Sequence, residues 1–218
     1  MIQPIVRLIL LTIVCAIGLV GALRAASDRP VSIVALGDSL TTGLGLPAND
    51  AFPAKLRRAL AAKGLAVEIA DAGVSGDTAS SGLARLAWSV PDGTDAVILE
   101  LGANDMLRGV DPKLTRGALE QIVRQLTDRG IPVLICGMRA APNLGEDYAR
   151  AFNVIFSELA AAYADRNVIL YPFFLDGVAA DPKLNQADGK HPTAAGVDVI
   201  VAHILPKVED LIARVKLR

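Results

Sequence analysis

The chain has 218 residues, which corresponds to one domain at roughly 100–200 residues per domain. Hydrophobic residues make up 52% of the chain and charged residues 21%, which excludes an intrinsically disordered protein. The 22 basic and 23 acidic residues give a net charge of −1, so we expect no nucleic-acid partner. Two cysteines and two histidines exclude a disulfide scaffold, a cysteine-only zinc site and a histidine-rich metal site.

The first 26 residues form an apolar segment with few charges. Residues 8–23 carry no charge and lie between Arg7 and Arg24. A basic start, an apolar core and small residues after it are typical of a secretory signal. The alternative is an uncleaved anchor, although this run is just short of the roughly 18 residues that span a bilayer. We therefore predict a signal peptide or membrane anchor over residues 1–26, a folded domain over residues 27–218, and a periplasmic or exported protein.

The rest of the chain alternates short apolar runs with helical patterns. Residues 96–101 are a nearly continuous apolar run, which is typical of a strand covered on both faces. Residues 113–129 repeat apolar side chains every four residues, which indicates a helix. In chain order, we predict a strand at residues 32–36, a helix at 51–63, a strand at 66–70, a helix at 78–88, a strand at 96–101, a helix at 113–129, a strand at 133–136, a helix at 146–165, a strand at 167–171 and a helix at 193–215 that bends near Pro206.

Five strands that alternate with helices predict a parallel sheet with helices on both faces. The predicted fold class is therefore α/β, a three-layer α/β/α sandwich of the flavodoxin-like kind. The longest irregular segment, residues 172–192, separates the last strand from the last helix. A loop of this length in a compact domain is often functional.

Polar or glycine-rich residues follow three of the predicted strands and precede the last helix. In an open α/β sheet, active sites lie at the carboxyl ends of the strands, so these segments are expected to converge at one edge. Together they offer a serine, a glycine, an asparagine and an Asp-x-x-His pair, which are groups that acyl transfer requires. The segments are Gly-Asp-Ser-Leu at 37–40, Gly-Val-Ser-Gly-Asp-Thr at 73–78, Gly-Ala-Asn-Asp at 102–105 and Asp-Gly-Lys-His-Pro at 188–192.

In this order, the four segments resemble the sequence blocks of the SGNH hydrolases, also called the GDSL esterase family. The resemblance covers most of the chain, residues 31–205. One block alone is weak evidence for the family, because Gly-Asp-Ser occurs by chance. Four blocks in the right order are strong evidence. Ala103 stands where the family often has glycine, a minor departure. Three further stretches resemble one bacterial branch of the family in particular, that of thioesterase I, lysophospholipase L1 and arylesterase. They are Ser-Gly-Asp-Thr at 75–78, Gly-Leu-Ala-Arg-Leu at 82–86 and Tyr-Pro-Phe-Phe at 171–174.

The resemblance implies a serine hydrolase in which Ser39 is the nucleophile, His191 is its base and Asp188 orients the histidine. It also implies that the backbone N–H groups of Ser39 and Gly76 and the side-chain amide of Asn104 hold the oxyanion. Taken singly, each residue has another interpretation. Ser39 is then a helix N-cap, and the others are turn residues.

The loops after the third and fourth strands are expected to border the serine, because of their place in the predicted sheet. Their apolar residues are predicted to line a pocket for the acyl chain of the substrate. These residues are Met106, Leu107, Ala140, Ala141, Pro142 and Leu144. The predicted function is hydrolysis of carboxylic esters or thioesters, such as acyl esters, acyl-CoA or lysophospholipids, through an acyl-serine intermediate. This chemistry requires no metal or organic cofactor, and we expect a monomer.

Two other functions remain open. A carbohydrate O-deacetylase can use the same catalytic residues, although sugar sites usually stack on aromatic side chains and only 4% of this chain is aromatic. A catalytically inactive envelope lipid-binding protein is disfavoured because every block is intact. A fluorophosphonate probe discriminates between an enzyme and such a module, since only an activated serine reacts quickly.

Several other residues are expected to support the structure. Asp38, Asp77 and Asp105 neighbour site residues and are predicted to brace loops and helix starts. Glu100 lies in an otherwise apolar strand and needs a polar partner if it is buried. Cys136 is predicted to be buried packing, and the second histidine, in the C-terminal helical tract, to have a surface or packing role.

Overall fold

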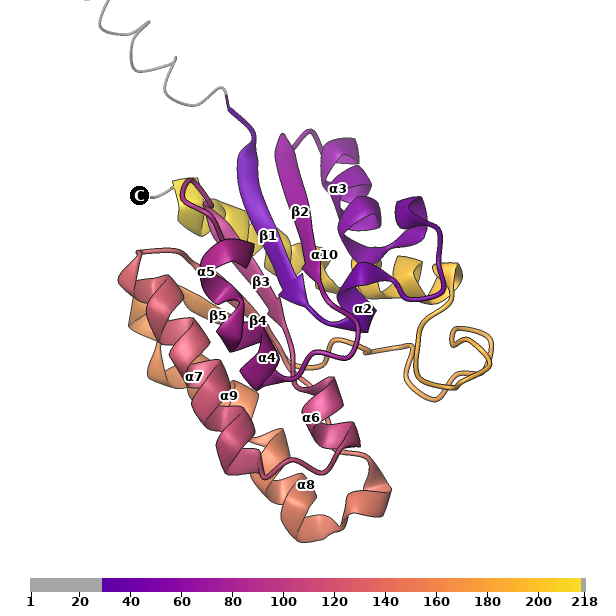
Figure 1. The fold of residues 1–218 in the computed structure, drawn as a ribbon. Helices are drawn as coiled ribbons and strands as arrows, with labels where there is room; N and C mark the ends of the chain where they lie inside the picture. Colours follow the sequence, from indigo (N-terminus) through magenta and orange to yellow (C-terminus); the bar gives the residue numbers. More distant parts are fainter. Residues whose placement is uncertain (1–28, 217–218) are drawn as a thin grey trace, which may run out of the picture. The chain divides into compact units, whose positions relative to one another are not determined.

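The computed structural model describes residues 29–216. From residue 31 onward, the chain folds around a five-stranded, parallel sheet with the strand order β2-β1-β3-β4-β5 (Figure 1). This order is the flavodoxin-like one, so the predicted fold class is confirmed. The predicted signal or anchor, residues 1–26, lies outside the described residues. The strands are β1 (Val31–Gly37), β2 (Val67–Gly73), β3 (Ala96–Glu100), β4 (Val133–Cys136) and β5 (Val168–Tyr171).

The central strands are apolar because helices cover both of their faces. Every residue of β3 and β4 is buried, as the continuous apolar runs predict. Strand β2 lies at an edge of the sheet and mixes buried with exposed residues. It extends to Gly73 rather than ending at residue 70, because an edge strand leaves the side chain of Asp71 exposed to solvent.

Helices pack on both faces of the sheet (Figure 1). On one face, α3 (Phe52–Ala62) packs against α10 (Ala194–Lys216), which continues through Pro206. On the other face, α7 (Pro112–Asp128) packs against α4 and α9 and buries the predicted apolar stripe from Ala118 to Leu126, whereas Leu114, at the start of that stripe, is exposed. The other helices of this face are α4 (Ala79–Ala84), α5 (Leu86–Ser89), α8 (Glu146–Asn153) and α9 (Ile155–Ala162).

Two of the predicted helices are each divided in the structure. The predicted helix at residues 78–88 consists of α4 and α5, which meet at Arg85. The buried guanidinium of Arg85 bonds Asp77 and Gly37, and its backbone departs from helical values (φ −104°, ψ 5°). The predicted helix at residues 146–165 consists of α8 and α9, which meet at Val154, and α9 ends at Ala162. Apolar periodicity continues across both interruptions, so it does not reveal them.

Short helices begin directly after two strands at the carboxyl end of the sheet. Helix α2 (Ser39–Thr42) follows β1, and α6 (Ala103–Leu107) follows β3. Residues 172–193 contain neither a helix nor a strand, as predicted, apart from a bridge between Asn185 and Pro192. No helix between residues 29 and 216 is long and apolar enough to cross a membrane. The 3₁₀ helices are η1 (Ala48–Asp50), η2 (Pro142–Leu144) and η3 (Ala164–Arg166).

Candidate active site

Ser39 lies after the carboxyl end of β1, where the strand order reverses between β1 and β3. It is the first residue of α2, and Asp38 caps this helix by accepting a hydrogen bond from the Leu40 N–H at 2.9 Å. The turn requires glycine at position 37, because a Cβ atom there would lie 2.0 Å from Thr41 Oγ1. A tight turn, braced by Asp38 as predicted, therefore presents Ser39 at the edge of the sheet.

Ser39, His191 and Asp188 form a continuous chain of contacts. The Oγ atom of Ser39 lies 2.9 Å from Nε2 of His191. The Nδ1 atom of the same ring lies 2.5 Å from Oδ2 of Asp188. A carboxylate only accepts hydrogen bonds, so Nδ1 carries the proton and Nε2 presents its lone pair to the serine hydroxyl. The structure thus brings together the three residues that the sequence places in a proton relay.

Asp188 also shapes the loop that carries His191. Its Oδ1 accepts hydrogen bonds from the backbone N–H groups of Lys190 at 2.9 Å and His191 at 3.0 Å. The bond from the His191 ring, followed by these two backbone bonds, holds the pKa of the Asp188 carboxyl well below its usual range. The side chain is 47% exposed. Asp188 is therefore both a turn residue and the partner of the histidine.

Gln186 joins the loop of His191 to the segment that follows Ser39. Its Nε2 donates to the carbonyl oxygens of Leu44 at 2.7 Å and Pro192 at 2.9 Å. Its backbone N–H donates to the carbonyl of His191 at 2.7 Å, and the Leu44 N–H donates to the carbonyl of Ser39 at 3.1 Å. A single residue therefore constrains the spacing between the two segments that carry Ser39 and His191.

The three predicted oxyanion donors line the same cleft. Among residues 29–216, no protein acceptor bonds the backbone N–H of Ser39 or of Gly76. Asn104 differs, because its Nδ2 donates to Oδ2 of Asp38 at 2.9 Å and to the carbonyl of Asp77 at 3.0 Å. Both amide hydrogens of Asn104 already have acceptors, so contact with an oxyanion requires it to share or release one of them.

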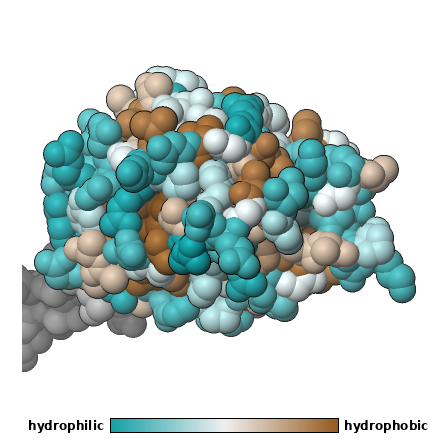
Figure 2. Space-filling model, turned by 90° about the horizontal axis from the view of Figure 1, so that it is seen from below, coloured by the Kyte–Doolittle hydropathy of each residue, from teal (hydrophilic) through white to brown (hydrophobic). Residues whose placement is uncertain are grey.

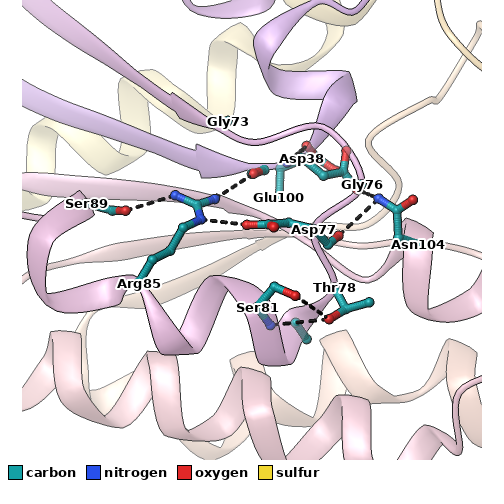
Figure 3. A network of polar contacts seen from close by, with 12 residues as sticks. Asp38, Gly73, Gly76, Asp77, Thr78, Ser81, Arg85, Ser89, Glu100 and Asn104 are labelled. Carbon is teal, nitrogen blue, oxygen red and sulfur yellow. Dashed lines mark hydrogen bonds and ion pairs between the residues drawn. The ribbon is translucent and has the colours of Figure 1, made fainter.

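A network of polar groups lies beside these donors (Figure 3). Glu100 is fully buried, and its Oε2 accepts hydrogen bonds from Thr41 Oγ1 at 2.7 Å and from the Asp38 N–H at 3.2 Å. The buried Glu100 therefore has polar partners on Oε2, whereas its Oε1 has no hydrogen-bond partner among residues 29–216. Burial raises the pKa of Asp38 to about 6, and burial together with the Asp38 charge raises the pKa of Glu100. Arg85 and Asp77 form an ion pair in the same network, with 2.6 Å between Nε and Oδ2.

A cleft of about 270 Å³ adjoins Ser39. Figure 2 looks onto the carboxyl end of the sheet and shows hydrophobic surface between hydrophilic residues. Of the predicted acyl-binding residues, Leu107 lines the cleft, whereas Met106 and Ala140 pack against the core and Pro142 lies in η2. A role for these others in binding a longer acyl chain stays a prediction, as it does for Ala141 and Leu144. The lining comprises Ser39, Leu40, Leu44, Ser75, Gly76, Ala103, Asn104, Leu107, Lys190 and His191.

Several residues of the site were not predicted from the sequence. Leu40 and Leu44 line the cleft from α2 and the turn after it. Leu44 is 47% exposed between two glycines, beside Ser39, and this place in the sequence is the one signal that could have pointed to it. Arg85 lies in the Gly-Leu-Ala-Arg-Leu block at 82–86, but its contacts, like those of Gln186, have no local signal, because the partners Gly37 and Leu44 lie 48 and 142 residues away in the sequence.

Three other residues singled out in the sequence lie outside the chain of contacts from Ser39 through His191 to Asp188. Asp105 accepts a hydrogen bond from the Ala79 N–H at 2.8 Å, so it braces the start of α4 as predicted. Cys136 is buried, as predicted. His203 lies on α10, half-exposed, with its Nδ1 3.3 Å from Oδ2 of Asp176. This position agrees with the predicted surface or packing role.

Comparison with known proteins identifies the family. The model of the GDSL-like lipase/acylhydrolase family matches residues 35–199. The arylesterase of Vibrio mimicus is 38% identical over 171 residues, which are 78% of this chain and 84% of that protein. The thioesterase 1/protease 1/lysophospholipase L1 of Escherichia coli strain K12 is 33% identical over 189 residues, 86% of each protein. The crystal structure of AlinE4, an SGNH-hydrolase family esterase, is 42% identical with a TM-score of 0.70, covering 84% of this chain and 97% of that one. The resemblance inferred from the four sequence blocks is therefore confirmed, and the chain belongs to the GDSL-like lipase/acylhydrolase family.

Proposed function

We propose that the protein hydrolyses carboxylic esters and thioesters through an acyl-Ser39 intermediate. The observation that carries the proposal is the chain of contacts from Ser39 Oγ through His191 to Asp188, at 2.9 Å and 2.5 Å. A serine hydroxyl is a weak nucleophile until a base accepts its proton, and the 2.9 Å contact supports His191 as that base. The relatives named arylesterase and thioesterase 1/protease 1/lysophospholipase L1 support ester and thioester substrates.

In the first half-reaction, Ser39 Oγ attacks the carbonyl carbon of the substrate while His191 Nε2 accepts the hydroxyl proton. Asp188 stabilises the imidazolium, and the low pKa of Asp188 keeps it ionised. The tetrahedral intermediate collapses, and the alcohol or thiol leaves with the proton from His191. In the second half-reaction, His191 takes a proton from water, the water oxygen attacks the acyl carbon, and Ser39 Oγ leaves with that proton.

The negative charge that forms on the carbonyl oxygen is assigned to three donors. The backbone N–H groups of Ser39 and Gly76 are free of protein acceptors in the described chain, which supports their role. Asn104 supplies the third donor by sharing the N–H that faces the Asp77 carbonyl or by turning it toward the oxyanion. Such a donor contributes about 3–4 kcal/mol of transition-state stabilisation.

The acyl group is proposed to bind in the cleft beside Ser39. Leu40, Leu44 and Leu107 give this cleft an apolar lining, and each CH₂ group buried there gains at most about 0.8 kcal/mol. The cleft volume of about 270 Å³ is at the small end of ligand sites, so a long acyl chain extends over exposed surface beyond it. We therefore expect kcat/KM to rise with acyl length from acetyl and then to level off.

A second candidate function is removal of acetyl groups from carbohydrates by the same residues. The small volume of the cleft favours this candidate, because an acetyl group needs little space. It predicts the opposite chain-length profile, with acetyl esters as the best substrates and a steady decline for longer chains.

The test combines labelling with a substrate series. Wild-type protein is treated with a fluorophosphonate and assayed on p-nitrophenyl esters of increasing acyl length, acyl-CoA and lysophospholipids. We expect rapid labelling and turnover, both of which Ser39→Ala abolishes. Ser75→Ala is the matched control, because this serine also lines the cleft but has no contact with His191. Wild-type protein that neither labels nor turns over any ester would be a binding module instead.

We also propose that the domain works outside the cytoplasm, free in the periplasm or tethered to the inner membrane through residues 1–26. The support is the uncharged run of residues 8–23 between Arg7 and Arg24. Cell fractionation with mass measurement distinguishes a cleaved from a tethered protein. Full-length protein that is soluble in the cytoplasm contradicts the proposal. Gel filtration of the purified domain tests the predicted monomer.

A further inference from the structure

We propose that Arg85 is a positioning residue for the oxyanion hole. Through its bonds to Gly37 and Asp77, Arg85 holds in place the segments that carry all three oxyanion donors. The inference rests on the proposed function of the site and adds a residue that touches neither the substrate nor the proton relay. It concerns the buried guanidinium at the junction of α4 and α5.

The guanidinium of Arg85 uses each of its three nitrogens. Nε contacts Oδ2 of Asp77 at 2.6 Å, Nη2 donates to the carbonyl of Gly37 at 2.9 Å, and Nη1 donates to Oγ of Ser89 at 2.9 Å (Figure 3). The residue is only 7% exposed. A planar, buried fork of this kind fixes the directions of its partners as well as their distances.

The partners of Arg85 lie next to the donors along the chain. Gly37 is the last residue of β1 and precedes the Asp38–Ser39 turn. Asp77 directly follows Gly76, and its carbonyl accepts the hydrogen bond from Asn104 Nδ2 at 3.0 Å. One guanidinium therefore links the segment of Ser39, the segment of Gly76 and, through the Asp77 carbonyl, the amide of Asn104.

Oxyanion stabilisation depends on this kind of preorganisation. Donors act on a developing charge only if they already point at it, since any rearrangement during the reaction cancels part of the gain. The Gly76 loop has exposed neighbours in Val74 and Ser75. It is held at the Gly76 carbonyl by Arg108 at 2.8 Å and at the Asp77 carboxylate by Arg85. Arg85 is the buried one of these two anchors.

The experiment compares Arg85→Lys with Arg129→Lys in the full chain. Arg129 is a matched control, because its guanidinium donates to the carbonyls of Val90 at 2.9 Å and Pro91 at 3.0 Å, before β3 and away from the cleft. A lysine keeps the charge but loses the fork in both variants. The measurements are kcat, KM, the melting temperature and the inhibition constant of an alkyl boronic acid, whose tetrahedral serine adduct places an oxygen in the oxyanion hole.

We expect Arg85→Lys to lower kcat by about 10–100-fold with KM changed less than about threefold, because the lost contacts act mainly on the transition state. Boronic acid inhibition should weaken by a similar factor. Arg129→Lys should lower the melting temperature and leave kcat, KM and inhibition at the wild-type values. Equal behaviour of the two variants, or unchanged boronic acid inhibition in Arg85→Lys, overturns the inference.

Asp77→Asn serves where Arg85→Lys does not fold, because asparagine keeps the size of Asp77 but loses the charged contact that holds Arg85 Nε. The same split between kcat and KM is expected, and its absence overturns the inference. Wild-type turnover is measured first, which separates the two levels of the proposal. If the wild type is inactive, both the proposed function and the proposed role of Arg85 are contradicted. If the wild type is active and Arg85→Lys has the same activity, only the role of Arg85 is contradicted.

Discussion

Ser39 lies between two groups of residues that are held in place in different ways. On the oxyanion side, Asp38 and Glu100 are fully buried and Arg85 nearly so, and they bond partners from several strand ends. On the relay side, Asp188 is 47% exposed and belongs to one loop between β5 and α10. The oxyanion side is therefore part of the folded core, whereas the relay side is attached to it.

This difference indicates which substitutions separate an effect on activity from an effect on stability. Removing one member of a buried polar network leaves its partner unsatisfied and costs folding free energy. Removing an exposed partner leaves a group that water can solvate. Substitutions on the relay side should therefore lower activity at constant stability, and substitutions on the oxyanion side should lower both.

Among substitutions in the two groups that flank Ser39, the largest effect is expected from Asp188→Asn. The substitution should lower kcat by about 10²–10⁴-fold, because the histidine loses its orienting acceptor and the imidazolium its counter-charge. The melting temperature should hardly change, since the side chain is half-exposed. Steady-state kinetics and thermal unfolding check both parts. Wild-type activity in Asp188→Asn would show that another carboxylate serves His191 or that the histidine works alone.

Asn104→Ala should have the next largest effect, and unlike Asp188→Asn it should lower stability as well as activity. We expect kcat to fall by about 10²–10³-fold with KM nearly unchanged. The melting temperature should also fall, because Asp38 Oδ2 and the Asp77 carbonyl lose a donor. The same two measurements decide the outcome. A variant that retains most of its kcat would make Asn104 a structural residue only.

Gln186→Ala tests whether the relay loop depends on its attachment to the segment of Ser39. The variant loses the bonds from Nε2 to Leu44 and Pro192, so the distance between Ser39 and His191 is less constrained. We expect kcat to fall on the order of 10-fold, with little change in KM or melting temperature. Gln186→Glu keeps the size but presents acceptors to two carbonyls, so it should be at least as impaired. Unchanged kcat in both variants would show that Asp188 alone orders the loop.

The two sides also differ in how far the sequence predicts them. The proposed relay residues and oxyanion donors lie in short blocks that follow strands or precede the last helix, so linear motifs in that context predict them. The sheet follows in the same way, because alternating apolar runs and helical patterns have few other solutions. These parts of the molecule are encoded locally.

Other parts depend on contacts between distant segments. The interruption at Arg85 reflects bonds to residues on another element, and the apolar period of the helix gives no sign of it. The attachment of Gln186 to Leu44 spans 142 residues. The lining by Leu40 and Leu44 depends on a turn whose path is set by glycines at both ends, for example Gly43 with φ = 71°.

The smallest effect is expected from Glu100→Gln, and it appears in the pH dependence of stability. Burial raises the pKa of Asp38 from 3.8 to about 6, and burial with the Asp38 charge raises the pKa of Glu100 well above 4.5. A carboxyl whose pKa is raised by folding adds stability below its unfolded pKa, and this contribution is lost as the pH rises through the folded value. The Asp38 contribution is therefore lost between pH 3.8 and about pH 6, and the Glu100 contribution is lost from about pH 4.5 upward, until Glu100 ionises in the folded protein.

Urea unfolding of wild type and Glu100→Gln over a series of pH values isolates this contribution. Above about pH 6, the wild-type free energy of unfolding should fall relative to that of the variant by up to about 1.4 kcal/mol per pH unit, until Glu100 ionises in the folded protein. The variant has no group that titrates at position 100, so the difference between the two curves belongs to that carboxyl. Parallel curves would show that Glu100 is already ionised beside Asp38, and that the hydrogen bonds from Thr41 and the Asp38 N–H are enough to hold two buried charges together.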